Sequence, residues 1–430
     1  MATATIGLLI GSVVIILLAS GLWIGAALGI SGTLAYYLYG GQRALGAVGY
    51  LTFNSLTSYD FAALSLFIFM ATILSNCGVT KRIYAGSAAL FARFPGGLLH
   101  ANVFGCALFA AICGSTAATC AAMSTIALPE LEKRNYPRPQ SLGSLAASGT
   151  LGPMIPPSLG FILYGVLTET SIGKLFMAGI IPGIVLAALF MTYILIRSIL
   201  CGDVPREERK SAAETAKDLF SVWPVFVLFI LVLGSIYFGI CTAVEAAALG
   251  CTGALLVAAF FRALNRNNLV MALKQGTNIA AMIFFVLLGG MILGHGLSNY
   301  GVPQYLVKLV TDASLSRYEL LAVLTAFYVI LGCFLDGAAI LVITLPLVFP
   351  VINAVGIDRI WFGVVMVLFT EIAAITPPVG VNLFVMQGIT KLPLEHIVRG
   401  VIPYIFLLLV LEILLIIFPG IATFLPSMMF

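Results

Sequence analysis

The sequence predicts an all-α polytopic membrane protein made of two inverted-topology repeats, each with a re-entrant helical hairpin and an unwound transmembrane helix. Of its 430 residues, 61% are hydrophobic and only 9% are charged, whereas a soluble domain has about 25% charged residues. Apolar windows of about 20 residues, long enough to span a bilayer, recur from end to end. These observations leave no room for a soluble domain.

A repeat in the positions of proline and glycine predicts the two halves. When the sequence is shifted by 221 residues, several residues coincide with an identical residue, four pairs of prolines among them. The pairs include Pro129 and Pro350, Pro156 and Pro377, Pro157 and Pro378, Gly179 and Gly400, Pro182 and Pro403, Ala117 and Ala338, and Ala118 and Ala339. The predicted repeats are residues 1–210 and 219–430, joined by a polar loop at 201–220.

Both halves divide into elements in the same order. The first apolar run (6–18) has no basic segment before it and is expected to be a retained span rather than a signal peptide. The first half has predicted spans at 3–20, 22–41 and 60–77, a basic connector at 81–93, an apolar pair at 98–113 and 117–129, an interrupted segment at 141–170 and a span at 174–198. The counterparts are 219–240, 242–262, 276–298, the pair 319–335 and 338–352, the interrupted segment 360–390, and 397–427.

The two apolar pairs are predicted to be re-entrant hairpins at 98–134 and 319–357. Their arms have about 13 to 17 residues, which is short for a span of about 20. The fold points "GST" and "DG" carry Ser115, Thr116 and Asp336 where a loop in water would be basic or more strongly charged. The alternative is two ordinary tilted spans joined by a tight turn.

The distribution of basic residues predicts the orientation. With the 197–217 segment in the cytoplasm, the cytoplasmic segments hold 16 of the 21 Lys and Arg residues, as the positive-inside rule requires. Five full passes separate equivalent points of the halves, so the repeats are inverted and both termini are predicted to be periplasmic.

The interrupted segments "SGTLGPMIPPSLGF" (148–161) and "ITPP" (375–378) should break their helices, because proline lacks an amide donor and disfavours helix before it. Irregular backbone is tolerated in a membrane only where it is buried in protein or lines a polar site. Inverted repeats with matching broken helices indicate a secondary transporter with a site at the bilayer midplane.

Each half therefore offers a hairpin tip and a helix break that can converge on a cation. Hydroxyl, carbonyl and carboxylate oxygens are hard ligands that suit Na⁺, and an intramembrane carboxylate such as Asp336 is functional by default. Serine and threonine can instead bond back to a helix carbonyl. The first set is Gly114, Ser115 and Thr116 with Ser148, Gly149, Thr150, Pro153, Pro156 and Pro157, and the second is Gly332, Asp336 and Gly337 with Thr376, Pro377, Pro378, Gly380 and Asn382.

Other reactive residue types give weaker signals. Glu245 and Glu371 are either ion-linked groups or paired charges at an interface, and the interface interpretation is favoured. Eight cysteines form no CxxC pair, and three histidines are far apart, so no metal site built from cysteine or histidine is expected. Neither a P-loop nor a catalytic constellation is present, which argues against an enzyme, and no nucleic-acid partner is expected.

The motifs "GSTAATCAAMSTIALPELEKRNY", "ASGTLGPMIPPSLGFILYGVLTETSIGKLFMAGIIPG" and "ITPPVGVNLFVMQGIT" resemble the large membrane subunit (M subunit) of TRAP transporters, the tripartite ATP-independent periplasmic type. The resemblance covers nearly the whole chain. It implies an elevator-type importer of the ion transporter superfamily in the bacterial inner membrane, driven by a Na⁺ gradient. It also implies a separate small membrane subunit of four spans and a soluble periplasmic binding protein. The binding protein would deliver an organic acid such as sialic acid or a C4-dicarboxylate.

The resemblance also implies roles for residues at the tips and breaks. Two or more sodium ions, and no other cofactor, would bind at the two sets. Family members often carry a second serine where this chain has Thr116, which retains the hydroxyl. The sodium-binding residues are expected to be Gly114, Ser115, Thr116, Gly149, Thr150, Pro153, Gly332, Asp336, Gly337, Thr376, Pro377 and Val379, and the organic anion is expected near Ser115, Ser158 and Asn382. The alternatives are a stand-alone sodium/anion symporter of the same superfamily and an ion channel.

Overall fold

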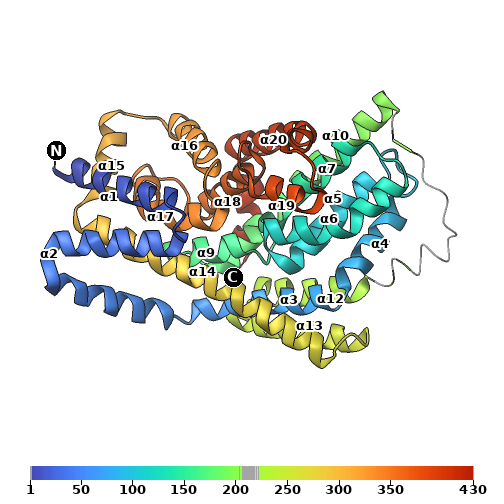
Figure 1. Ribbon diagram of the computed structural model, residues 1–430, viewed down its shortest axis with the longest axis horizontal. Helices are drawn as coiled ribbons and strands as arrows, with labels where there is room; N and C mark the ends of the chain where they lie inside the picture. The colour runs from blue at the N-terminus through green and yellow to red at the C-terminus, as the bar shows by residue number, and fades with distance from the viewer. Residues whose placement is uncertain (1, 203, 206–217, 219, 221, 430) are drawn as a thin grey trace.

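The structure is a computed structural model that describes residues 2–202, 204–205, 218, 220 and 222–429. Every regular element among these residues is a helix (Figure 1). In the described part of the chain, six helical segments are long and apolar enough to cross a membrane, or seven if the bent pair Ile24–Leu56 and Asp60–Asn76 counts as one span. The predicted all-α polytopic class is therefore confirmed. The predicted loop at 201–220 lies mostly outside the described residues.

The described part of the first half contains ten helices. They are α1 (Ala2–Ala19), α2 (Ile24–Leu56), α3 (Asp60–Asn76), α4 (Val79–Phe91), α5 (Leu98–Cys113), α6 (Thr116–Lys133), α7 (Arg138–Ser148), α8 (Leu151–Met154), α9 (Leu159–Thr168) and α10 (Ile172–Cys201).

The described part of the second half contains ten more. They are α12 (Trp223–Tyr237), α13 (Ala243–Phe260), α14 (Arg266–Asn299), α15 (Val302–Asp312), α16 (Arg317–Gly332), α17 (Gly337–Ala354), α18 (Arg359–Ile375), α19 (Val381–Thr390), α20 (Leu394–Ile417) and α21 (Gly420–Ser427).

The helix boundaries repeat at the same interval as the prolines. Adding 221 to the bounds of α6 gives 337–354, which are the bounds of α17, and adding it to α9 gives 380–389, one residue before α19. The paired helices α5–α6 and α16–α17 occupy the positions of the predicted hairpins.

Figure 1 shows these two hairpins on opposite sides of a centre formed by α9, α18 and α19. The long helices α2 and α14, with α3, α12 and α13, run along one edge of the molecule, and we call these five helices the scaffold layer. We call α5 to α9 and α16 to α19 the central unit.

Glycines allow the two longest helices of the scaffold layer to approach closely. A Cβ atom added at Gly32 of α2 would lie 2.5 Å from the backbone nitrogen of Leu293 in α14, and one added at Gly289 would lie 2.3 Å from the carbonyl oxygen of Gly25. Small residues at such contacts are the usual means of helix association in a membrane, because van der Waals packing replaces the hydrophobic effect there.

Several predicted boundaries differ from the structure. The span predicted at 22–41 does break at its end, where Gly40 and Gly41 have non-helical dihedral angles, but helix resumes and continues to Leu56. α14 begins ten residues before its predicted start at 276, because Asn265 caps it by accepting a hydrogen bond from the Asn268 amide at 2.8 Å. The basic connector forms most of α4, and α15 was not predicted as a helix.

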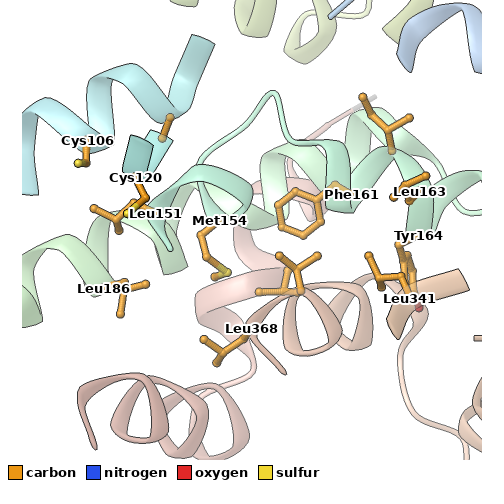
Figure 2. Packing of buried hydrophobic residues seen from close by; sticks show 14 of the residues in the cluster. Cys106, Cys120, Leu151, Met154, Phe161, Leu163, Tyr164, Leu186, Leu341 and Leu368 are labelled. Atoms are coloured by element: carbon orange, nitrogen blue, oxygen red, sulfur yellow. The ribbon is translucent and has the colours of Figure 1, made fainter. Parts of the chain in front are cut away.

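The broken segment Arg138–Thr168, which comprises α7, α8 and α9, is the most enclosed candidate span. In its most apolar window 78% of residues are buried, against 33% for α10. Figure 2 shows Met154 and Phe161, on either side of the break, facing the helix that carries Leu368 of α18. The irregular backbone is therefore covered by protein, as the absence of water in a bilayer requires.

Candidate functional site

The first hairpin tip turns at Gly114, which closes α5 in a left-handed conformation with φ of +60°. Its amide donates to the carbonyl of Ala110 at 2.9 Å, and its carbonyl accepts from the amide of Leu159 at 3.2 Å. A Cβ atom at position 114 would lie 2.6 Å from the carbonyl oxygen of Pro157. Glycine thus lets the first tip bond directly to the break between α8 and α9.

Ser115 follows in an extended conformation and precedes α6, but its hydroxyl makes no capping bond to that helix. The N-terminal end of α6 carries amides without intrahelical partners and a partial positive charge. Ser115 therefore presents, at the start of a helix, a hydroxyl that does not cap that helix.

The first break exposes a carbonyl that the other repeat binds. The amide of Thr150 donates to Ala147 at 2.9 Å, three residues back, which leaves the carbonyl of Ala146 to accept from Nδ2 of Asn382 at 2.7 Å. Asn382 is fully buried, and its Oδ1 has no hydrogen-bond partner among the described residues. The hydroxyl of Thr150 donates to Ala147 at 2.6 Å, the local bond that serine and threonine often make in helices.

The second tip packs against the second break in a similar way. A Cβ atom on Gly332 would lie 2.1 Å from Cβ of Ala373, and the thiol of Cys333 donates to the carbonyl of Pro377 at 3.4 Å. Asp336 caps α17, with Oδ1 accepting from the amide of Ala339 at 3.2 Å. Asp336, which sequence analysis singled out, therefore stabilises the start of α17 through Oδ1, and its Oδ2 takes no part in this cap.

A cavity of about 150 Å³ lies between the two tips. Two carboxylates line it, those of Asp336 and Glu371, and its described lining contains no lysine, arginine or histidine. Six residues of the predicted sodium sets line it: Gly114, Ser115, Thr116, Pro153, Asp336 and Gly337. The other members of the two sets and the other predicted ligands lie outside its lining: Ser148, Gly149, Thr150, Pro156, Pro157, Ser158, Gly332, Thr376, Pro377, Pro378, Val379, Gly380 and Asn382.

Glu371 is the residue that sequence analysis undervalued. It is 2% exposed, and its Oε1 and Oε2 accept from the hydroxyl of Thr116 at 2.9 and 2.8 Å. This pair joins residues 255 positions apart, one on the first tip and one on the helix that leads to the second break. The signal was available in the repeat, because subtracting 221 from 371 gives Thr150, a predicted sodium ligand.

The scaffold layer contributes only apolar side chains to this cavity. They are Ile279, Met282 and Ile283, all from α14. All of the hydroxyls and both carboxylates come from the central unit, so the polar site belongs to that unit alone.

A second, larger hollow of about 970 Å³ lies between the α2–α3 junction, the α9–α10 turn and the start of α13. Its lining includes Asp60, Glu169 and His295. Glu245 is close in sequence to this region but caps α13, where its carboxylate accepts from the amide of Thr242 at 2.8 Å. The structural role of Glu245 thus accounts for its charge.

Comparison with known proteins identifies the family of this chain. The profile of the tripartite ATP-independent periplasmic transporter, DctM component, matches residues 12–421. The chain is 33% identical over 404 residues to the C4-dicarboxylate TRAP transporter large permease protein DctM of Pseudomonas aeruginosa, covering 93% of this chain and 94% of that protein. It is 27% identical to the sialic acid TRAP transporter large permease protein SiaM of Vibrio cholerae, over 96% of both chains.

A solved structure supports the fold independently. The YdaH transporter of Alcanivorax borkumensis superposes with a TM-score of 0.59 over 88% of this chain and 89% of that one, at 14% identity. The profile and the permease relatives show a transporter component rather than an enzyme. The chain belongs to the family of TRAP transporter large permease subunits, the DctM component of the tripartite ATP-independent periplasmic transporters.

Proposed function

We propose that this subunit imports an organic acid across the bacterial inner membrane and that a Na⁺ gradient drives the import through an elevator mechanism. The observation that carries the proposal is the cavity between the two tips, which has two carboxylates and no basic side chain in its described lining. Such a cavity attracts cations, and it repels an organic anion until cations have entered.

This charge arrangement supports an obligatory order of binding. Two unit charges 4 Å apart interact by about 4 kcal/mol at the effective dielectric constant near a protein surface, and more strongly in the interior. An anion that entered beside Asp336 and Glu371 would meet a repulsion of at least that order, while two sodium ions would cancel the charge of the two carboxylates. The anion would then cross only in a site that already holds its sodium ions, because without them its charge adds to that of Asp336 and Glu371.

The position of the polar groups supports an elevator. Side-chain hydrogen bonds hold each unit together internally, such as Asn76 to Gln275 at 2.8 Å in the scaffold layer and Asn102 to Ser144 at 2.9 Å in the central unit. The wall of the cavity on the scaffold side is apolar. The central unit could therefore slide past α14 carrying its whole polar site, without exchanging hydrogen bonds at each step.

The volume of the cavity bears on the substrate. At about 150 Å³ it is smaller than the 300–1,000 Å³ typical of sites for drug-sized ligands. A small dicarboxylate with its ions suits this volume better than a sugar acid, for which the tips would have to separate. The relatives that carry C4-dicarboxylate in their names agree with this preference.

The partners follow from the family. A small membrane subunit of four spans would complete the scaffold layer, and a periplasmic binding protein would deliver the acid to the outer face. In the predicted orientation both termini and the hollow lined by Asp60 and Glu169 face the periplasm.

Transport by reconstituted protein tests the proposal. The large and small subunits are reconstituted into liposomes, the binding protein is added outside, and uptake of labelled succinate or sialic acid is measured with and without an inward Na⁺ gradient. We expect accumulation only when the Na⁺ gradient and the binding protein are both present. Accumulation without a Na⁺ gradient would refute sodium coupling, uptake without the binding protein would indicate a stand-alone symporter, and a large ionic conductance would indicate a channel.

A further inference from the structure

The carboxylate of Glu371 has too few partners for a buried charge. A carboxylate offers about four lone-pair sites, and buried charges are normally paired or bound to a metal ion. The single hydroxyl hydrogen of Thr116 is shared between both oxygens of Glu371. Thr370 lies 3.4 Å from Oε1, but its hydroxyl already donates to the carbonyl of Val367 at 2.7 Å.

The surroundings supply no opposite charge. The side chains that share the cavity with Glu371 include another acid, Asp336, and no base among the described residues. The start of α6 beside Thr116 offers the partial charge of a helix N-terminus, equivalent to about half a unit. That leaves about half of the charge on Glu371 uncompensated, although the residue is only 2% exposed.

We propose that Glu371 and the hydroxyls of Thr116 and Thr370 form a sodium-binding site that joins the two repeats. The inference rests on the proposed sodium coupling and adds a ligand that neither the tip motifs nor the breaks include. Carboxylate and hydroxyl oxygens are hard donors, which suit Na⁺ rather than a soft metal. An ion held there contacts the first tip through Thr116 and the helix before the second break through Glu371.

Such an ion would couple the two repeats, because its binding would affect residues of both. Thr370 also touches the second tip, since a Cβ atom on Gly337 would lie 3.1 Å from its Cβ. An ion that orders Thr116, Thr370 and Glu371 therefore fixes both tips against the same turn of α18. The two hairpins would close on the substrate together rather than one at a time.

Sodium-dependent stability of the purified complex tests this inference without knowledge of the substrate. The large and small subunits in nanodiscs are heated in a series of NaCl concentrations, with KCl keeping the ionic strength constant. Ligands that bind only the folded protein raise its stability with their concentration. In Glu371→Gln the NaCl concentration for half-maximal stabilisation should rise at least about tenfold, because one charge-assisted contact is worth that factor.

The matched control is Glu412→Gln. Glu412 is also a buried carboxylate, 5% exposed, and it accepts a hydrogen bond from Thr325, but it lies outside the cavity lining. We expect its NaCl dependence to stay within about twofold of the parent protein, the range expected for a distant site. A shift equal to that of Glu371→Gln would overturn the inference.

Thr116→Val provides a second route if Glu371→Gln does not fold. It removes the hydroxyl and keeps the shape, so the NaCl dependence should shift in the same direction, whereas Thr116→Ser should restore it. Because glutamine mimics a protonated acid, an unchanged NaCl dependence in Glu371→Gln would show that no sodium ion binds there. If the parent protein itself shows no stabilisation by NaCl over KCl, the proposed sodium coupling fails instead.

Discussion

Replacing Gly114 by alanine should destabilise the protein more than the same change at Gly202. Both glycines end a helix in the left-handed region, with φ of +60° and +61°. Alanine costs about 1–2 kcal/mol in that conformation, so this part of the penalty is equal at the two positions. A Cβ atom at 202 has no described atom within 4 Å, whereas one at 114 would lie 2.6 Å from the carbonyl oxygen of Pro157.

The additional cost at Gly114 comes from the contact between the first tip and the first break. Forcing extra volume into a packed site costs about 1–3 kcal/mol, so Gly114→Ala should lose about 2–5 kcal/mol in total, and Gly202→Ala about 1–2 kcal/mol. Apparent unfolding midpoints of both variants are compared with the parent at one scan rate, because large membrane proteins unfold irreversibly. Equal shifts for the two variants would refute the direct contact between tip and break.

Three further predictions concern the site and the scaffold layer. Asp336→Asn should lose sodium-dependent uptake while keeping its helix cap, because asparagine caps as well as aspartate; Asp358→Asn, at a matching cap outside the cavity, should retain uptake. Ser115→Ala should change the unfolding free energy by less than about 0.5 kcal/mol, because this hydroxyl caps no helix, yet raise the sodium concentration for half-maximal uptake. Gly32→Ala should cost about 1–3 kcal/mol by forcing α2 from α14, whereas Gly46→Ala, on an open face of α2, should be neutral or stabilising, as thermal unfolding would show.

Sequence alone predicted the elements that are punctuated by proline and glycine. The arms of both pairs and both interruptions lie within a few residues of α5, α6, α16, α17 and the breaks, because these residues restrict the local backbone whatever surrounds them. The membrane class followed from composition, because so few charged residues cannot cover the surface of a soluble protein of this size. The inverted orientation of the repeats and the sodium ligands stay predictions.

Other features depend on contacts that no local pattern reveals. α14 begins at Arg266, before its apolar stretch, because Asn265 caps its N-terminus. In a hydropathy pattern such a polar first turn looks like a loop. The resumption of α2 after Gly41 is a similar case.

Glu371 shows the same limit within the site. Its neighbours in sequence are apolar, and its partner Thr116 is 255 residues away. Apart from its register with Thr150 in the repeat, nothing in the sequence around Glu371 distinguishes a carboxylate in a cavity from one paired at an interface. The sequence also left open whether Thr376 bonds back to its own helix. In the structure its hydroxyl does so, donating to the carbonyl of Ile372 at 2.6 Å.

The most direct test of the inverted arrangement measures the membrane face of the two outer hairpin ends. Lys133 and Ala354 are the last residues of α6 and α17, are both exposed and are 221 residues apart. Each is changed to cysteine in a protein whose exposed Cys201 is replaced by serine, and sealed vesicles of known orientation are treated with a membrane-impermeant thiol reagent. Two oppositely oriented hairpins predict labelling of Lys133→Cys from the cytoplasmic side only and of Ala354→Cys from the periplasmic side only; labelling of both from one side would contradict that arrangement.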